Sequence, residues 1–132
     1  MQPRTFEVQA IGVVESPLVD PGEAPKQGTE GGREAGLVFE PSMADALADL
    51  AVGDRIVVLT WLDRADRGVL RVHPRDDPAN PERGVFSTRS ADRPNPIGLH
   101  PVDILEVRGT RIRVRDLEAV DGTPIVDVKP VL

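Results

Sequence analysis

The residues best suited to chemistry lie in one polar loop between residues 84 and 99. Its sequence is GVFSTRSADRPNPIGL, and it carries two arginines, Arg89 and Arg93. Pro94 and Pro96 fix their own backbone torsions and push the residues before them toward extended geometry, so the loop is stiffened beside its charges. A stiff loop that presents guanidinium groups is suited to capture a small anionic or zwitterionic ligand. A structural turn with solvated arginines is the alternative that spacing alone leaves open.

A second candidate segment lies in the stretch from residue 16 to residue 36, which is rich in Pro, Gly, Glu and Lys and poor in apolar residues. Its most distinctive sequence is Pro25-Lys26-Gln27-Gly28. Long ordered loops in compact domains often have functional roles. Composition alone favours a flexible surface loop here, so both interpretations stay open.

Apolar patterning around these loops predicts strands. They are expected at residues 5–14, 36–40, 54–62, 69–72, 102–108, 111–115 and 125–130. The segment 54–62 is almost continuously apolar, which predicts a central strand buried on both faces. Val85 and Phe86, at the start of the polar loop, predict the end of a further buried strand.

One helix is predicted over residues 42–50, because apolar residues recur there at helical spacing: Met43, Ala46, Leu47 and Leu50. Gly109-Thr110 predicts a tight hairpin turn. Together, about seven or eight short strands, one short helix and long loops predict a mainly β fold, a small closed β-barrel. We expect a single domain over residues 1–132.

Composition narrows the possible functions. The net charge is −6, with 16 basic and 22 acidic residues, which argues against a surface broadly built to neutralise phosphates. The absence of cysteine excludes disulfides and thiolate sites, and His73 and His100 are too few for a histidine-built metal centre, so we expect no metal. No apolar run approaches a membrane span and no signal-peptide core is present, so a soluble cytoplasmic protein is expected.

Residues 84–99 closely resemble the signature G-V-F-x-T-R-S-x-x-R-P-N-P-I-G of the TsaA-like family, whose best-understood members are TrmO-type tRNA methyltransferases. Residues 121–130, DGTPIVDVKP, are similar to the second signature of that family, D-G-T-P-x-x-D-x-K-P. Residues 11–17, IGVVESP, match its first strand. Three motifs in the same order over nearly the whole chain make the resemblance specific.

The resemblance implies a small β-barrel that binds S-adenosylmethionine as a homodimer. The sequence has no Gly-rich βαβ fingerprint of the Rossmann-type methyltransferases. The implied activity is N6-methylation of threonylcarbamoyladenosine at position 37 of tRNA. A methyltransferase for a different small acceptor and a non-catalytic S-adenosylmethionine-binding module are the alternatives that stay open.

Matching positions imply a set of cofactor-binding residues. They are Lys26, Gln27, Gly28, Asp63, Arg64, Arg89, Leu99, Arg115, Asp116, Leu117 and Glu118. Lys26 stands where the family has the arginine of a Pro-Arg-Gln segment, and it keeps the charge without the bidentate geometry. Asp63-Arg64 stand where the family has a histidine and its neighbour.

The chemistry of the cofactor suits these residue types. Arg89 is suited to its carboxylate, Glu118 or Asp116 to its ribose or ammonium group, and Leu99 with backbone groups to its adenine. The sulfonium is already a strong electrophile, so the enzyme mainly needs to place the nucleophile in line with the methyl group. A general base is optional, and Asp121 and Asp63 are the candidates.

A row of arginines is predicted on one face of the strand at 111–115. Arg111, Arg113 and Arg115 alternate there with Ile112 and Val114. A solvated sheet face is the favoured interpretation. The alternative hypothesis is that two such rows form one basic groove for tRNA in a dimer.

Overall fold

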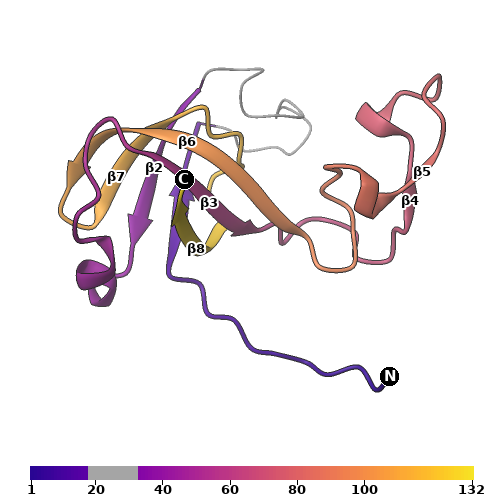
Figure 1. Cartoon of the computed structure of the whole chain (residues 1–132), viewed down its shortest axis with the longest axis horizontal. Coiled ribbons are helices and arrows are strands. Elements are labelled where there is room, and N and C mark those ends of the chain that lie inside the picture. The colour runs from indigo at the N-terminus through magenta and orange to yellow at the C-terminus, as the bar shows by residue number, and fades with distance from the viewer. Residues whose placement is uncertain (18–32) are drawn as a thin grey trace.

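The computed structural model of the chain describes residues 1–17 and 33–132. In this part of the chain, six antiparallel strands form a closed barrel, and a two-stranded sheet lies in a lobe that projects from one end of it (Figure 1). The barrel strands are β1 (Gly12–Glu15), β2 (Glu34–Phe39), β3 (Arg55–Trp61), β6 (Ile97–Arg108), β7 (Arg111–Arg115) and β8 (Pro124–Pro130). Their order is β1, β2, β7, β6, β3, β8, and β8 pairs back with β1.

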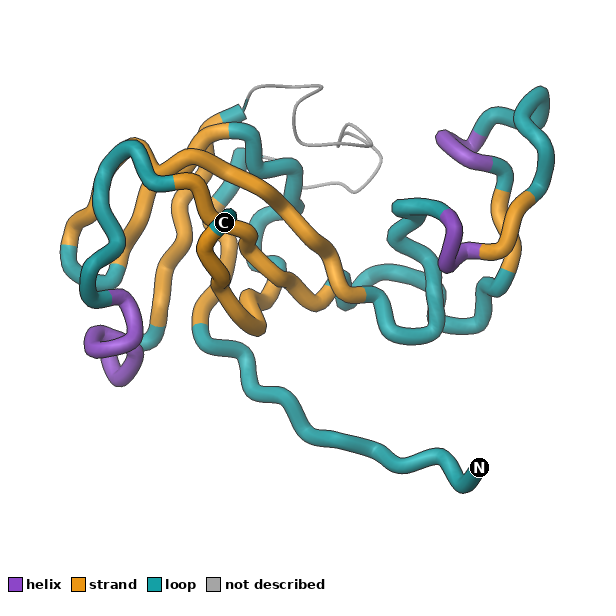
Figure 2. Tube along the Cα trace, viewed as in Figure 1, coloured by secondary structure: helices purple, strands orange, loops and turns teal. Residues whose placement is uncertain are grey.

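The lobe comprises residues 63–96. It holds β4 (Arg71–Val72) and β5 (Arg83–Gly84) together with two short 3₁₀ helices, η4 (Pro74–Asp76) and η5 (Val85–Ser87). Most of the lobe is loop (Figure 2). Only Val85 and Pro96 are buried among its residues.

Alternating side chains build the barrel core. In β3 the side chains of Ile56, Val58 and Thr60 are fully buried, whereas Val57, Leu59 and Trp61 are partly exposed. The prediction of a strand buried on both faces is therefore wrong, because a barrel has one interior and the outer face of this strand is uncovered. The mainly β fold is confirmed, and the described barrel has six strands instead of about seven.

The first predicted strand is much shorter than expected. Residues 5–11 form no strand: the exposed N-terminal segment leads away from the barrel (Figure 1), and Ile11 joins it to the barrel through its N–H, which donates to the carbonyl of Ile125 at 2.8 Å. The neighbouring chain explains this, because β2 ends at Phe39 and Pro41 opens the 3₁₀ helix η3 (Pro41–Leu47). Residues 5–10 therefore have no strand to pair with on the β2 side.

Two further expectations on local structure need correction. The predicted α-helix over 42–50 is the 3₁₀ helix η3, although Met43, Leu47 and Leu50 still pack against the core. Val85 and Phe86 begin η5 and do not end a strand, and Phe86 is 81% exposed. The small lobe has no second layer that could cover both side chains.

The hairpin after the lobe is confirmed, with Gly109 at positive φ between β6 and β7. Strand β6 begins at Ile97, five residues before the predicted start. Pro101 lies in the part of β6 that has an open edge, because β7 pairs with β6 only from Asp103 onward. The residues described contain no helix with the length and apolarity needed to cross a membrane.

A polar pair lies between β3 and β6, with Thr60 fully buried and His100 half-buried. Oγ1 of Thr60 and Nε2 of His100 share a hydrogen bond of 2.8 Å. Gly98 makes this packing possible, since a Cβ there would collide with Oγ1 of Thr60 and lie 2.7 Å from Nε2 of His100. Burial lowers the pKa of His100 from 6.5 to about 4, so the ring is neutral at pH 7.

The buried imidazole predicts a pH-dependent stability. Between pH 6.5 and about 4 the unfolded chain protonates His100 while the folded chain does not, so stability is full above pH 6.5 and falls as the pH drops through this window. We expect this group to account for about 1–3 kcal/mol of that loss. Urea unfolding at pH 7 and pH 4.5 should show a smaller loss for His100→Gln than for the wild type. The matched control is His73→Gln, which changes the exposed histidine, and an equal effect of both variants would contradict the prediction.

Candidate functional site

The strand directions bring three connecting segments to one end of the barrel. β1 ends at Glu15 and β2 begins at Glu34, β3 ends and β6 begins at the lobe, and residues 116–123 join β7 to β8. The resemblance implies cofactor contacts in each of these three segments. Lys26, Gln27 and Gly28 lie outside the described residues.

The segment after β7 forms the rim of this barrel end. Arg115 is exposed and lies opposite Glu34 of β2 and Asp103 of β6. Asp116 takes a left-handed backbone, with φ of 72°, and its N–H donates to the carbonyl of Arg33 at 2.7 Å. A left-handed aspartate costs conformational energy, and such outliers cluster at functional sites.

The next two rim residues turn inward. Leu117 is fully buried in the hydrophobic core, so only its backbone can contact a ligand. Glu118 is 9% exposed. Burying a carboxylate costs free energy, so a buried glutamate at the rim is an unusual residue that marks a candidate binding position. Across the rim, Oδ1 of Asp121 accepts the N–H of Ser16 at 2.9 Å, which ties the end of β1 to this segment.

The base of the lobe is held by contacts that the sequence analysis did not identify. The Arg67 side chain donates from Nε to the carbonyl of Pro94 at 2.7 Å and from Nη2 to Oδ1 of Asn95 at 3.0 Å. Its guanidinium lies 5.2 Å from the ring centroid of Trp61. The charge cluster after the central strand was the sequence feature that could have indicated these Arg67 contacts, but charge clusters usually mark solvated turns. Asp63 and Arg64, the predicted residues in this cluster, are exposed at the start of the lobe.

The two arginines of the polar loop have different roles. Arg93 donates from Nε to the carbonyl of Ser90 at 2.7 Å and from Nη2 to the carbonyls of Val85 and Thr88 at 2.8 and 2.6 Å. Arg89 is exposed and makes no hydrogen bond or ion pair with the described residues. The loop therefore uses Arg93 to fix its own backbone and leaves the Arg89 guanidinium open to a ligand.

Leu99 lies between the rim and the lobe. It is on the outer face of β6, opposite Leu59 of β3, and is 47% exposed. Strand β6 extends from Asp103 to Ile97 beyond the end of β7, which at about 3.3 Å per residue is roughly 20 Å. Leu99, Asp63, Arg64 and Arg89 thus belong to this projecting part, whereas residues 115–118 belong to the rim.

The arginine row of β7 is a solvated face with internal ion pairs. Arg111 lies 3.2 Å from a carboxylate oxygen of Glu15, and Arg113 pairs with Glu34. All three arginines of the row are exposed. Two of them are already neutralised by neighbouring strands, which weakens the hypothesis of a basic groove on this face.

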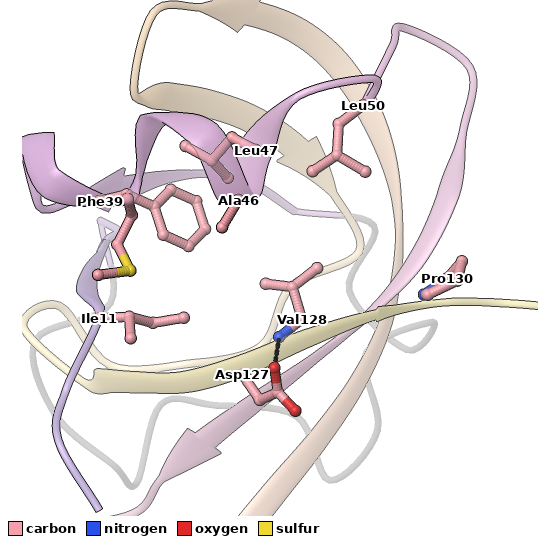
Figure 3. A pocket seen from close by; sticks show the side chains of 9 residues that line it. Ile11, Phe39, Ala46, Leu47, Leu50, Asp127, Val128 and Pro130 are labelled. Atoms are coloured by element: carbon pink, nitrogen blue, oxygen red, sulfur yellow. Dashed lines mark hydrogen bonds between the residues drawn. The ribbon is translucent and has the colours of Figure 1, made fainter.

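A hollow of about 200 Å³ lies at the opposite end of the barrel, between η3 and β8 (Figure 3). Apolar side chains dominate its lining, and Asp127 points away from it toward its bond with the N–H of Val128 (Figure 3). No predicted site residue contributes to the hollow. Its place under η3 and its apolar lining indicate a packing gap, so we do not assign the site there. The described residues also contain no His, Asp or Glu cluster arranged to hold a metal.

Comparison with known proteins shows the family of the chain. The family model of the tRNA-methyltransferase O N-terminal domain matches residues 13–132. The chain belongs to this family. The family assignment suggested by the polar-loop signature is thereby confirmed.

Several relatives are similar over most of their length. The chain is 43% identical over 130 residues to a probable S-adenosyl-L-methionine-binding protein of Methanothermobacter thermautotrophicus, covering 98% of this chain and 93% of the relative. It is 44% identical over 122 residues to an S-adenosyl-L-methionine-binding protein of Archaeoglobus fulgidus, covering 92% and 86%. The crystal structure of TrmO from Pseudomonas aeruginosa matches with a TM-score of 0.79 and 25% identity over 98% of this chain. The chain spans 57% of the length of that solved protein.

Measurements of lobe stability can test the different roles of Arg93 and Arg89. Arg93→Ala removes three hydrogen bonds to main-chain carbonyls, so we expect the free energy of opening the lobe to fall by about 2 kcal/mol. Hydrogen exchange at the amide of Thr88, which bonds to the carbonyl of Val85, should then be about 30-fold faster. Arg89→Ala should change neither measurement, and equal effects of both substitutions would contradict the assignment.

Proposed function

We propose that the chain is an S-adenosylmethionine-dependent methyltransferase that N6-methylates threonylcarbamoyladenosine at position 37 of tRNA in the cytoplasm. The observation that carries the proposal is the exposed guanidinium of Arg89, which has no partner among the described residues and is held on a loop that Arg93 makes rigid. The family assignment and the names of the relatives support the choice of cofactor. The family description supports the choice of tRNA.

Each part of the cofactor has a suitable group on the rim or on the lobe. Arg89 would bind the carboxylate through paired hydrogen bonds, and Glu118 or Asp116 would bind the ammonium or ribose groups. Leu99 would pack against the adenine with its half-exposed side chain. Lys26, Gln27, Gly28, Asp63, Arg64, Arg115 and the backbone of Leu117 complete the proposed set.

The protein's role in methyl transfer is mainly positional. The bound cofactor supplies an electrophilic methyl group, and the chain must hold the acceptor nitrogen in line with it. The proton released from the nitrogen needs an acceptor, which water can provide. Asp63 is the exposed carboxylate at the lobe base, whereas Asp121 already accepts the N–H of Ser16, so Asp63 is the better placed of the two candidates for a general base.

The proposed assembly is a homodimer. On the outer face of the barrel, β3 and β6 align apolar side chains in cross-strand pairs: Leu59 with Leu99 and Trp61 with Ile97. Ile97 and Leu99 are 49% and 47% exposed. A continuous apolar strip on a sheet face supports a protein interface, since covering it removes apolar surface from water.

A second candidate function is a binding module without turnover. The relatives that match nearly full length are named for S-adenosyl-L-methionine binding. Such a module would bind the cofactor equally well and transfer no methyl group. A methyltransferase for a small acceptor other than tRNA is the third alternative.

The first test is calorimetric titration of the wild type and Arg89→Ala with S-adenosylmethionine and S-adenosylhomocysteine. We expect the wild type to bind both ligands. Loss of a charge-assisted pair should weaken binding by about 10- to 150-fold in Arg89→Ala. An unchanged dissociation constant in the variant would show that Arg89 is not part of the cofactor site.

An assay of methyl transfer distinguishes the tRNA methyltransferase from the binding module and from a methyltransferase for a small acceptor. The wild type should convert S-adenosylmethionine to S-adenosylhomocysteine with threonylcarbamoylated tRNA and not with tRNA lacking that group. Mass spectrometry of digested nucleosides then locates the methyl group. Cofactor binding with no product from any tRNA pool would favour the binding module, and product formation with free nucleosides alone would favour a small acceptor.

A further inference from the structure

We propose that the lobe is the RNA-docking surface, with Phe86 as a platform for one unstacked base and Arg83 as a phosphate contact. The inference rests on the proposed function, because it assumes that the acceptor is an RNA loop. It assigns RNA recognition to residues outside the predicted cofactor set. The lobe is also the part of the chain that projects furthest from the barrel on that side (Figure 1).

The exposure of Phe86 has no explanation in the fold. The side chain is 81% exposed, whereas its neighbour Val85 is 2% exposed and anchors η5 to the lobe. Burying a phenylalanine stabilises a protein by about 1.5–3 kcal/mol, so an outward ring forgoes that gain. Leu70, 64% exposed, lines the same surface hollow with Gly84, Val85, Phe86 and Ser87. The result is an apolar platform open to solvent.

The backbone under the ring is rigid. Both the N–H and the Oγ1 of Thr88 donate to the carbonyl of Val85, at 3.0 and 2.9 Å. The Ser87 hydroxyl donates to the carbonyl of Gly84 at 2.9 Å, and Arg93 fixes the turn from its other side. A ligand that stacks on Phe86 therefore loses little free energy in ordering the turn, which is the advantage of a preorganised surface.

The charge around Phe86 favours a phosphate-bearing partner. Residues 83–91 hold two arginines, Arg83 and Arg89, placed three positions before and after Phe86, and no carboxylate. Arg71, on the neighbouring strand, is bound by Glu82 at 2.7 Å, whereas Arg83 is exposed and makes no hydrogen bond or ion pair with the described residues. An exposed cation three residues from an exposed ring is a combination suited to single-stranded nucleic acids, which bind through the backbone and through base stacking.

The distribution of charge along the chain also favours the lobe, which is less acidic than the rest of the chain. The lobe has seven arginines and six acidic residues, a net charge of +1, while the chain carries −6, which leaves −7 for the rest. An RNA approaching the protein is repelled by the rest of the chain more than by the lobe. The proposed cofactor arginine, Arg89, lies three residues after Phe86, so the base platform and the cofactor contact would belong to the same loop.

The test compares Phe86→Ala, Phe86→Trp and Arg83→Gln with the wild type. Fluorescence anisotropy measures binding of a labelled anticodon stem-loop RNA at several salt concentrations, and calorimetry measures S-adenosylmethionine binding. Phe86→Ala should weaken RNA binding by about 5- to 150-fold, and Phe86→Trp should restore it. Arg83→Gln should weaken binding and reduce the salt slope by roughly 0.7–0.9. Cofactor affinity should be unchanged in all three variants.

The matched charge control is Arg113→Gln, which removes an exposed arginine already paired with Glu34 and should leave RNA binding unchanged. Normal RNA binding by Phe86→Ala would overturn the inference, as would wild-type protein that does not bind the RNA. A change of oligomeric mass in Phe86→Ala would identify a protein interface instead. Failure of the proposed function is separate, because it appears as missing cofactor binding or methyl transfer in the wild type.

Discussion

The pairing of β3 with β6 is the interaction on which the rest of the structure depends. It runs over seven residue pairs, from Arg55 with Asp103 to Trp61 with Ile97, and joins the barrel to the lobe. Because β7 stops at the level of Asp103, the edge of β6 that faces β7 is unpaired from Val102 to Ile97, while β3 stays paired with β8 as far as Thr60. Gly98 permits the inner packing of β3 with β6, since any side chain there would displace the bonded pair of Thr60 and His100. The glycine of the signature is thus explained by packing alone.

Polar contacts, more than burial, hold the lobe together. With only Val85 and Pro96 buried, its hydrophobic core is negligible. Arg67 and Arg93 replace that core by binding main-chain carbonyls at the base and in the polar loop. Such a framework can keep other side chains fully exposed in fixed positions, which a core-based framework cannot do without burying them.

The sequence predicted the architecture better than the details of the site. Alternating apolar segments located most of the barrel strands, because one face of a barrel wall packs on the core and the other faces water. The same periodicity failed for residues 5–10 and for Phe86, where an apolar pattern exists but the described fold leaves the side chains exposed. Spacing could not separate Arg89 from Arg93 either. Their roles depend on which carbonyls lie within reach, and that is decided by the folded loop.

Net charge was a poor guide to where a polyanion could bind. The chain is acidic, yet its charges are segregated: glutamates of β1 and β2 neutralise two arginines of β7, while Arg83 and Arg89 in the lobe remain open. Electrostatic attraction between exposed groups falls off within about 10 Å at moderate salt, so a bound phosphate senses the local arrangement far more than the total. The face with the most regular row of arginines is therefore the weaker candidate for RNA. The irregular lobe, where Arg83 and Arg89 have no partner among the described residues and the Phe86 ring is exposed, is the stronger one.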